Sequence, residues 1–206
     1  MLQGLKTLKT AGMCHRNLSL DTIAMDGDHI DIVGLGWALP CDDSNATETI
    51  PREDGVSTTV APTPGGSDPR FIPPESFVSL RSNESIATIS SSNDVAWNGF
   101  RDDLWAAGLI LYSMVVGTDA LFASPIVGDQ RFKKLCIQGD VQGEVQRFGI
   151  QLSDNLVRLL QSMMGADPQH RPTLEQVLED AWVTNADVSV TPTSFSARLN
   201  PNPFAT

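Results

Sequence analysis

The stretch of sequence that decides the fold spans residues 15–23 and consists of His15-Arg16-Asn17-Leu18-Ser19-Leu20-Asp21-Thr22-Ile23. A second short motif, Gly34-Leu35-Gly36, follows it along the chain. Between them, two apolar runs flank Asp26-Gly27, a dipeptide that favours a two-residue hairpin turn because both central positions of such a turn need positive φ. The sequence therefore predicts a small β-hairpin over residues 23–33 that joins the two motifs.

The two motifs resemble the catalytic loop and the metal-binding motif of protein kinases. In that family the loop has the pattern His-Arg-Asp-x-Lys-x-x-Asn, and the second motif is Asp-Phe-Gly. His15 and Arg16 match the loop. The side chains that perform the chemistry differ: Asn17 stands at the Asp position, Ser19 at the Lys position, Thr22 at the Asn position, and Gly34-Leu35-Gly36 replaces Asp-Phe-Gly. The resemblance implies a kinase fold whose catalytic residues are not intact.

These replacements predict that phosphoryl transfer fails. The amide of Asn17 cannot accept a proton at neutral pH, and the loss of a general base typically lowers a rate by about 10²–10⁴. Ser19 has no charge to steady a phosphate, and Mg²⁺ prefers carboxylate ligands to the hydroxyl of Thr22 or the bare backbone of Gly34. Asp21 and Asp31 are nearby carboxylates, but each lies at a position that the family does not use. We therefore expect no metal or cofactor, and ATP with magnesium only if these positions prove functional.

Further matches follow in the family's order. Phe71-Ile72-Pro73-Pro74-Glu75 resembles the Ala-Pro-Glu motif, so residues 36–75 correspond to the activation segment. Residues 103–112 are similar to the family's Asp-x-Trp-Ser-x-Gly helix, and Asp167-Pro168-x-x-Arg171 matches its Asp-Pro-x-x-Arg linker. The resemblance covers residues 2–182, up to a Trp182 at the end of the last helix. It implies a mainly α fold, the C-terminal lobe (C-lobe) of a kinase, with the small hairpin near the catalytic loop.

The resemblance also assigns structural roles. The residues that match those holding a kinase C-lobe together are His15, Arg16, Glu75, Asp103 and Arg171. Glu75 and Arg171 are expected to form a buried ion pair. His15 is interpreted as a packed structural histidine rather than a base or a ligand, whereas His29 and His170 are expected at the surface.

Local patterns predict the helices. Residues 2–10 repeat leucine every three positions, so they form the end of an amphipathic helix that stops near Gly12. Their lysines, with no acid before Asp21, also fit a mitochondrial transit peptide, but the motif that follows at once favours the helix. The apolar run 104–116 is shorter than the roughly 18 residues of a membrane span and is interpreted as a buried helix ending at Gly117.

Three shorter helices are predicted towards the C-terminus. Phe132, Leu135 and Ile137 indicate one that closes near Gly139. Ser153 is the N-cap of the next, and Thr173 with Gln176 has the spacing of a capping box.

Three segments have the composition of loops. Residues 40–70 are rich in Pro, Ser, Thr, Gly and Asp and are interpreted as an irregular loop, and residues 79–93 form a second, Ser-rich insertion. Both insertions are expected to be disordered or used for interaction, with phosphorylation by other kinases as one hypothesis. The folded domain is placed at residues 1–182, and residues 183–206 are expected to be a disordered tail.

Composition limits the partners and the compartment. The chain has 206 residues and a net charge of −11, which argues against nucleic acid or an anionic membrane as a partner. Cys14, Cys41 and Cys136 are far apart in sequence and form no metal-ligand spacing, so we expect no zinc site, no disulfide framework and a reducing, cytoplasmic location. Asn-x-Ser/Thr triplets at Asn17, Asn45 and Asn83 matter only in a secreted protein.

Three functional hypotheses remain open. The first is a pseudokinase, a protein-binding or scaffolding module without phosphotransfer whose partners are other proteins, among them an active kinase. The second is a fragment of an active serine/threonine kinase that binds ATP and phosphorylates proteins. The third is that the chain has no independent function. We find no glycine-rich loop, strand Lys or helix Glu of the upper lobe, and a start inside a helix suggests a truncated gene; the oligomeric state is left open.

Overall fold

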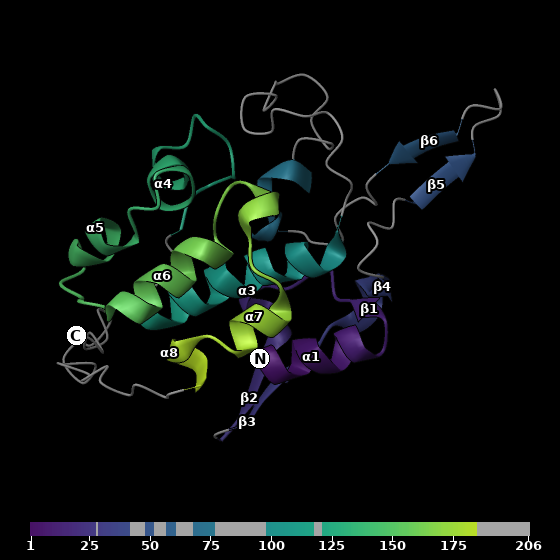
Figure 1. Cartoon of the computed structure of the whole chain (residues 1–206), viewed down its shortest axis with the longest axis horizontal. Helices are drawn as coiled ribbons and strands as arrows, with labels where there is room; N and C mark the ends of the chain where they lie inside the picture. Colours follow the sequence, from purple (N-terminus) through teal and green to yellow (C-terminus); the bar gives the residue numbers. More distant parts are fainter. Residues whose placement is uncertain are drawn as a thin grey trace, which may run out of the picture.

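The computed structural model describes residues 1–27, 29–41, 48–51, 57–60, 68–76, 98–117 and 121–184. Most of the regular structure in these residues is helical, as predicted, and the strands pair in short antiparallel two-stranded sheets (Figure 1). The helices are α1 Leu2–Thr10, α3 Gly99–Val116, α4 Gln130–Phe132, α5 Val141–Gln146, α6 Asp154–Met163, α7 Leu174–Leu178 and α8 Ala181–Thr184. The strands are β1 Met13–Cys14, β2 Ile23–Asp26, β3 His29–Ile32, β4 Leu39–Pro40, β5 Glu48–Pro51 and β6 Ser57–Val60.

Helix α3 is the centre of the core. Asn98 caps its N-terminus by accepting the Arg101 N–H, and Gly117 ends it in the left-handed conformation, at φ 68°. Its residues are buried almost all round, which is why the apolar run has no polar face. Figure 1 shows α3 running through the middle of the molecule with α6 alongside it. The interpretation as a buried helix is therefore confirmed.

The contact between α3 and α6 depends on a glycine. A Cβ atom placed on Gly108 would lie 2.9 Å from Cβ of Met163, so the backbone of α3 approaches α6 where the side chain is absent. The rings of Trp105, Phe122 and Phe132 form an aromatic cluster with centroid distances of 5.4–6.4 Å. All three rings are buried.

The predicted caps of the later helices are confirmed. Ser153 accepts the Leu156 N–H at the start of α6, and Thr173 and Gln176 exchange hydrogen bonds at the start of α7. The helix predicted near residue 132 consists of α4 and a π-helical turn at Lys133–Ile137, and Gly139 follows with φ 66°.

The N-terminal helix α1 is part of the fold, which supports the helix interpretation of residues 2–10. Leu5 is buried, and Lys9 forms an ion pair of 3.0 Å with Glu175 in α7. Gly12, with φ 67°, follows the helix as predicted. Figure 1 shows α1 and α7 side by side below α3.

The β-hairpin between the two motifs is present as β2 and β3, but its turn is one residue later than predicted. Asp26 pairs with His29 at the end of the ladder, so the connection lies at residues 27–28 rather than at Asp26-Gly27. Gly27 has φ 58°, the conformation that the turn requires. The predicted glycine is therefore used, but the aspartate belongs to the strand.

The prediction of an irregular loop over residues 40–70 is wrong in part. Within it, β5 and β6 pair in register from Glu48–Val60 to Pro51–Ser57, and η3 at Pro69–Phe71 is a helical turn. The threonines on both strands suit an extended backbone. Residues 79–93, predicted as a second insertion, lie outside the described residues.

The C-terminal boundary is also shifted. Helix α8 continues to Thr184, two residues beyond the predicted end of the folded domain at residue 182, and Asp180 accepts the Trp182 N–H in its first turn. The remainder of the predicted tail lies outside the described residues. Among the helices that the structure describes, none combines the length and the apolar character needed to cross a bilayer.

Candidate functional site

The two motifs that dominate the sequence lie together around the buried carboxylate of Asp103. This carboxylate, from the first turns of α3, accepts the backbone N–H of His15 at 2.6 Å and that of Arg16 at 2.8 Å. Arg16 has a left-handed backbone with φ 65°, which is costly for a residue with a Cβ. The hydrogen bond from its N–H to Asp103 therefore holds a strained conformation in place.

His15 connects the first motif to the second. Its ring is buried; Nδ1 accepts the Asn17 N–H at 3.2 Å, so the proton of the neutral ring is on Nε2, which donates to the Val33 carbonyl at 2.9 Å. Burial lowers the pKa of His15, although the Val33 carbonyl acts in the opposite direction. The neutral ring therefore links the loop at Asn17 to Val33, the residue that precedes Gly34.

Burial shifts the pKa values of Asp103 and His15 in opposite directions. Burial raises the pKa of Asp103 to about 7, although the N–H groups of His15 and Arg16 both favour its charged form and lower it. The two N–H donors are the hydrogen-bond partners that a buried carboxylate requires. Through these two hydrogen bonds, Asp103 connects the start of α3 to the loop at His15 and Arg16, a connection that we call the joint.

Thr22 and Gly34, which match the positions of the family's metal ligands, lie next to each other. The Val33 N–H donates to the Thr22 carbonyl at 2.9 Å, and a Cβ on Gly34, which has φ 81°, would lie 3.2 Å from Cγ2 of Thr22. The Thr22 hydroxyl accepts the Ser19 N–H and donates to the Ser19 carbonyl, both at 3.0 Å. The Thr22 hydroxyl is therefore hydrogen-bonded to both backbone groups of Ser19.

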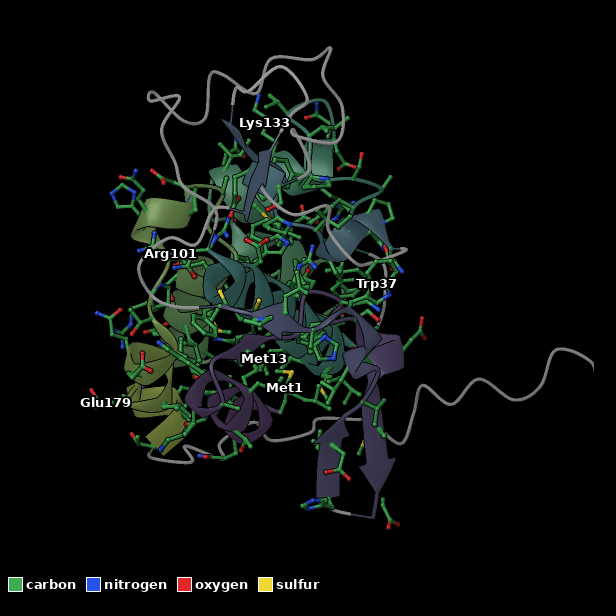
Figure 2. All side chains as sticks on the ribbon, turned by 90° about the vertical axis from the view of Figure 1, so that its right-hand side faces the viewer. Met1, Met13, Trp37, Arg101, Lys133 and Glu179 are labelled. Atoms are coloured by element: carbon green, nitrogen blue, oxygen red, sulfur yellow. The ribbon has the colours of Figure 1, made fainter. Side chains whose placement is uncertain are left out.

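The remaining predicted positions line the surface beside this loop. Asn17 is half-buried, and Leu35 and Gly36 lie in the 3-10 turn η2, Leu35–Trp37. The exposed fractions of Val33, Leu35 and Trp37 are 41%, 51% and 53%. Figure 2 shows Trp37 at the edge of the molecule. We refer to these three side chains as the apolar strip.

The carboxylates considered as alternative metal ligands do not gather at the site. Asp21 is exposed, and Asp31 lies on the hairpin, where His29 approaches it to 3.2 Å. Within the described ranges, no group of three His, Cys, Asp or Glu side chains is arranged to hold a metal ion. His29 and His170, with side-chain exposures of 77% and 86%, are surface residues as predicted.

The predicted ion pair between Glu75 and Arg171 is present. The guanidinium donates two hydrogen bonds to the carboxylate, at 2.6 and 2.7 Å, and a third from Nε to the Gly165 carbonyl at 2.9 Å. It also lies over the ring of Trp105, 4.8 Å from the centroid. The Arg171 side chain is fully buried, whereas 18% of the Glu75 side chain is exposed, so the pair is buried on one side only.

The structure adds a contact that the sequence analysis missed. Cys14 and Cys41, which are far apart in sequence, lie side by side with Phe100 in a small buried cluster, and both are free thiols. Cys14 is in β1 and Cys41 directly follows β4. No local pattern signals this contact because it depends on the pairing of two-residue strands.

No protein-family model matches the chain. The human "Hormonally up-regulated neu tumor-associated kinase" is 23% identical over 89% of the chain and 21% of its own length. "Serine/threonine-protein kinase zyg-8" of Caenorhabditis elegans is 24% identical over 89% of the chain and 20% of its own length. "Probable serine/threonine-protein kinase fhkA" of Dictyostelium discoideum is 26% identical over 89% of the chain and 31% of its own length.

These similarities support a relationship to the protein kinase family. The chain spans between a fifth and a third of the length of these curated relatives. What the relationship means for activity depends on the residues at the site.

Proposed function

We propose that this chain is a kinase-like C-lobe without phosphotransfer, a pseudokinase that acts by binding or scaffolding other proteins. One observation carries the proposal: the contacts that hold the loop are present, while the positions of the base and the metal ligands are occupied by Asn17, Thr22 and Gly34. His15, Arg16 and Asp103 form the joint with α3, and Glu75 with Arg171 forms the second joint. The fold is thus maintained by groups that take no part in the chemistry.

The hydrogen bonds of the loop support the loss of metal binding. Magnesium in such a site needs oxygen ligands directed at a common point. The Thr22 hydroxyl is directed at the backbone of Ser19 instead, and Gly34 has no side chain to offer. A proton acceptor at position 17 is replaced by an amide, so neither metal-assisted charge neutralisation nor base catalysis has its usual groups.

The competing function is that of an active serine/threonine kinase fragment. It is favoured by the relatives, which are named as serine/threonine-protein kinases. A phosphotransfer assay separates the two. The full chain is incubated with Mg²⁺ and ATP labelled at the γ-phosphate, together with a mixture of Ser- and Thr-containing peptides. We expect no transfer above the enzyme-free blank. Transfer that disappears in an Asn17→Ala variant would overturn the proposal, because only activity of the chain itself depends on that residue.

We propose that the apolar strip is the surface that binds other proteins. Three large apolar side chains that are close together in sequence and each about half exposed are more typical of an interaction site than of a solvated turn. We expect a Leu35→Ser/Trp37→Ser variant, isolated from the native cells, to lose specific associated proteins that the unmodified chain retains. Met25, which is 66% exposed on the hairpin, supplies the matched control as Met25→Ser. An identical set of associated proteins in all three samples contradicts the assignment of this surface.

The proposed location is the cytoplasm. The three cysteines are free thiols, which is the usual state in a reducing compartment. Fractionation of the native cells tests this part of the proposal, and recovery in a secreted fraction would contradict it.

A further inference from the structure

The cluster of Cys14, Cys41 and Phe100 lies where β4 returns to β1. Cys14 stands opposite Leu39 in the ladder, and the Cys41 N–H donates to the Gly12 carbonyl at 2.8 Å, which extends the pairing beyond the strand. Cys14 and Cys41 are therefore diagonal neighbours on one face of the two-stranded sheet, and their side chains meet in the buried cluster with Phe100. The Cys14 thiol has two acceptors beside it, the Leu39 carbonyl at 3.5 Å and the sulfur of Cys41.

The two thiols occupy different environments. Sγ of Cys41 accepts the N–H groups of Gly99 and Phe100, the first two residues of the 18-residue helix α3. These N–H groups have no partner within the helix and lie at the positive end of its dipole, so they favour a thiolate. Hydrogen-bond donation from Cys14, followed by these two N–H groups, lowers the pKa of Cys41 against the opposing effects of burial and of Asp103.

Cys14 has the opposite character. Its hydrogen bond to Cys41 is the largest cause of a raised pKa, followed by burial and the charge of Asp103, while Arg16 acts in the other direction. Its thiol is completely buried, whereas Cys41 keeps 6% of its surface exposed. An oxidant from solvent therefore meets Cys41 first, and meets it in its more nucleophilic form.

We propose that Cys14 and Cys41 form a redox-sensitive pair that hydrogen peroxide converts into a disulfide, with Cys41 as the attacking thiol and Cys14 as the resolving thiol. Nothing in this inference depends on the proposed pseudokinase function, because the pair is defined by its own geometry.

The reaction has two steps. The Cys41 thiolate attacks one oxygen of peroxide; an S–O bond forms, the O–O bond breaks and hydroxide leaves, taking up a proton to become water. The sulfur of Cys14 then attacks the sulfenic acid sulfur of Cys41; an S–S bond forms, the S–O bond breaks and a second water leaves with the Cys14 proton. The two thiols lose two electrons and two protons in total, and peroxide is reduced to two water molecules.

The product would join two parts of the candidate site covalently. Cys14 immediately precedes His15, and Cys41 lies at the start of the segment that leads away from the apolar strip. The disulfide therefore fixes β4 to the base of the loop, at the N-terminus of α3. Reduction would release it.

Peptide mapping of the full chain provides the experiment. Trypsin cuts after Lys9, Arg16 and Arg52, so Cys14 and Cys41 fall on different peptides, and Cys136 falls on a third. The reduced chain is treated with hydrogen peroxide, denatured, alkylated and digested without a reductant. We expect alkylation of Cys14 and Cys41 to be lost, and a cross-linked peptide containing both to appear, while Cys136 remains alkylated. Cys136 serves as the internal control because it is buried in the main core, where burial raises its pKa.

Two variants test the assignment of roles, and a cooperative thermal melt establishes that each is folded. In Cys14→Ser the reaction is expected to stop at an oxidised, uncross-linked Cys41. In Cys41→Ser, Cys14 is expected to remain alkylated like Cys136. A peroxide-treated chain in which Cys14 and Cys41 are alkylated as fully as Cys136, or in which either cross-links to Cys136, overturns the proposal. Oxidation of Cys14 in the Cys41→Ser variant overturns the order of attack.

Discussion

Replacement of Arg171 by alanine provides the sharpest test of how the fold is held together. The substitution removes a guanidinium whose side chain is fully buried and leaves three acceptor atoms without their donor: both oxygens of Glu75 and the Gly165 carbonyl. It also removes the cation from the face of Trp105. The deletion of one partner of a buried ion pair typically destabilises a protein by about 3–5 kcal/mol.

The partial exposure of Glu75 decides where in that range the effect falls. With 18% of its side chain exposed, the carboxylate can regain some hydration, which places the loss of the pair near the lower end, about 3 kcal/mol. The orphaned Gly165 carbonyl and the lost contact with Trp105 each add about 1 kcal/mol. For a chain of this length, the resulting total of about 5 kcal/mol corresponds to a decrease in Tm of roughly 10–20 °C.

The assay is urea unfolding together with a thermal melt of the full chain. Arg158→Ala is the matched control, because Arg158 is exposed and contacts Asn155 on the surface of α6, where substitutions usually change stability by about 0.5 kcal/mol or less. A double-mutant cycle with Glu75→Ala isolates the pair, and we expect a coupling of about 1–3 kcal/mol. If Arg171→Ala destabilises the chain no more than Arg158→Ala, the reasoning is refuted.

Three further predictions concern α3 and the joint around it. Asp103→Ala leaves the buried N–H groups of His15 and Arg16 without an acceptor, so urea unfolding should show a loss of about 1–3 kcal/mol for each group; an unchanged midpoint would contradict the assigned joint. Because the folded-state pKa of His15 is lowered, the unfolded chain takes up the proton first as pH falls through the ordinary histidine range, and stability is lost in that direction. The raised pKa of Asp103 acts in the opposite direction, but Asp103 is present both in the wild type and in a His15→Gln variant. The variant should therefore lose less Tm on acidification than the wild type. An equal decrease of Tm with pH in both proteins would argue against a neutral, buried His15. Gly108→Val places atoms where a Cβ already lies 2.9 Å from Met163 and should destabilise the chain by about 1–3 kcal/mol, whereas a neutral result would mean that α3 and α6 can separate freely.

The parts of the fold that were predictable from sequence are those with local signals. Ser153, Thr173 with Gln176, and Gly117 mark helix ends through hydrogen bonds or backbone angles that involve only neighbouring residues. The pairing of Glu75 with Arg171 was predictable only through the resemblance to kinases, since nothing in the intervening sequence indicates it.

Features that depend on distant segments were missed. The contact of Cys14 with Cys41 follows from the pairing of two-residue strands, which are too short to show an alternating pattern. Glu144 is almost completely buried, although an acidic residue on a short helix is normally expected in solvent; Arg147 at 3.0 Å and Lys134 at 3.3 Å supply the charges that permit it. The turn of the β2–β3 hairpin was misplaced because Asp26, a residue type favoured in turns, instead pairs with His29 at the end of the ladder.

The close approach of Thr22 to position 34 has a consequence for attempts to install a metal-binding carboxylate there. In the kinase pattern these two positions are Asn and Asp. A side chain introduced at position 34 would place its Cβ 3.2 Å from Cγ2 of Thr22, a methyl group that asparagine lacks. It would also have to adopt the left-handed backbone found at this position, with φ 81°, which is costly for a residue with a Cβ. The two positions are therefore coupled: an engineered carboxylate at position 34 meets less steric resistance when Thr22 is replaced by asparagine at the same time.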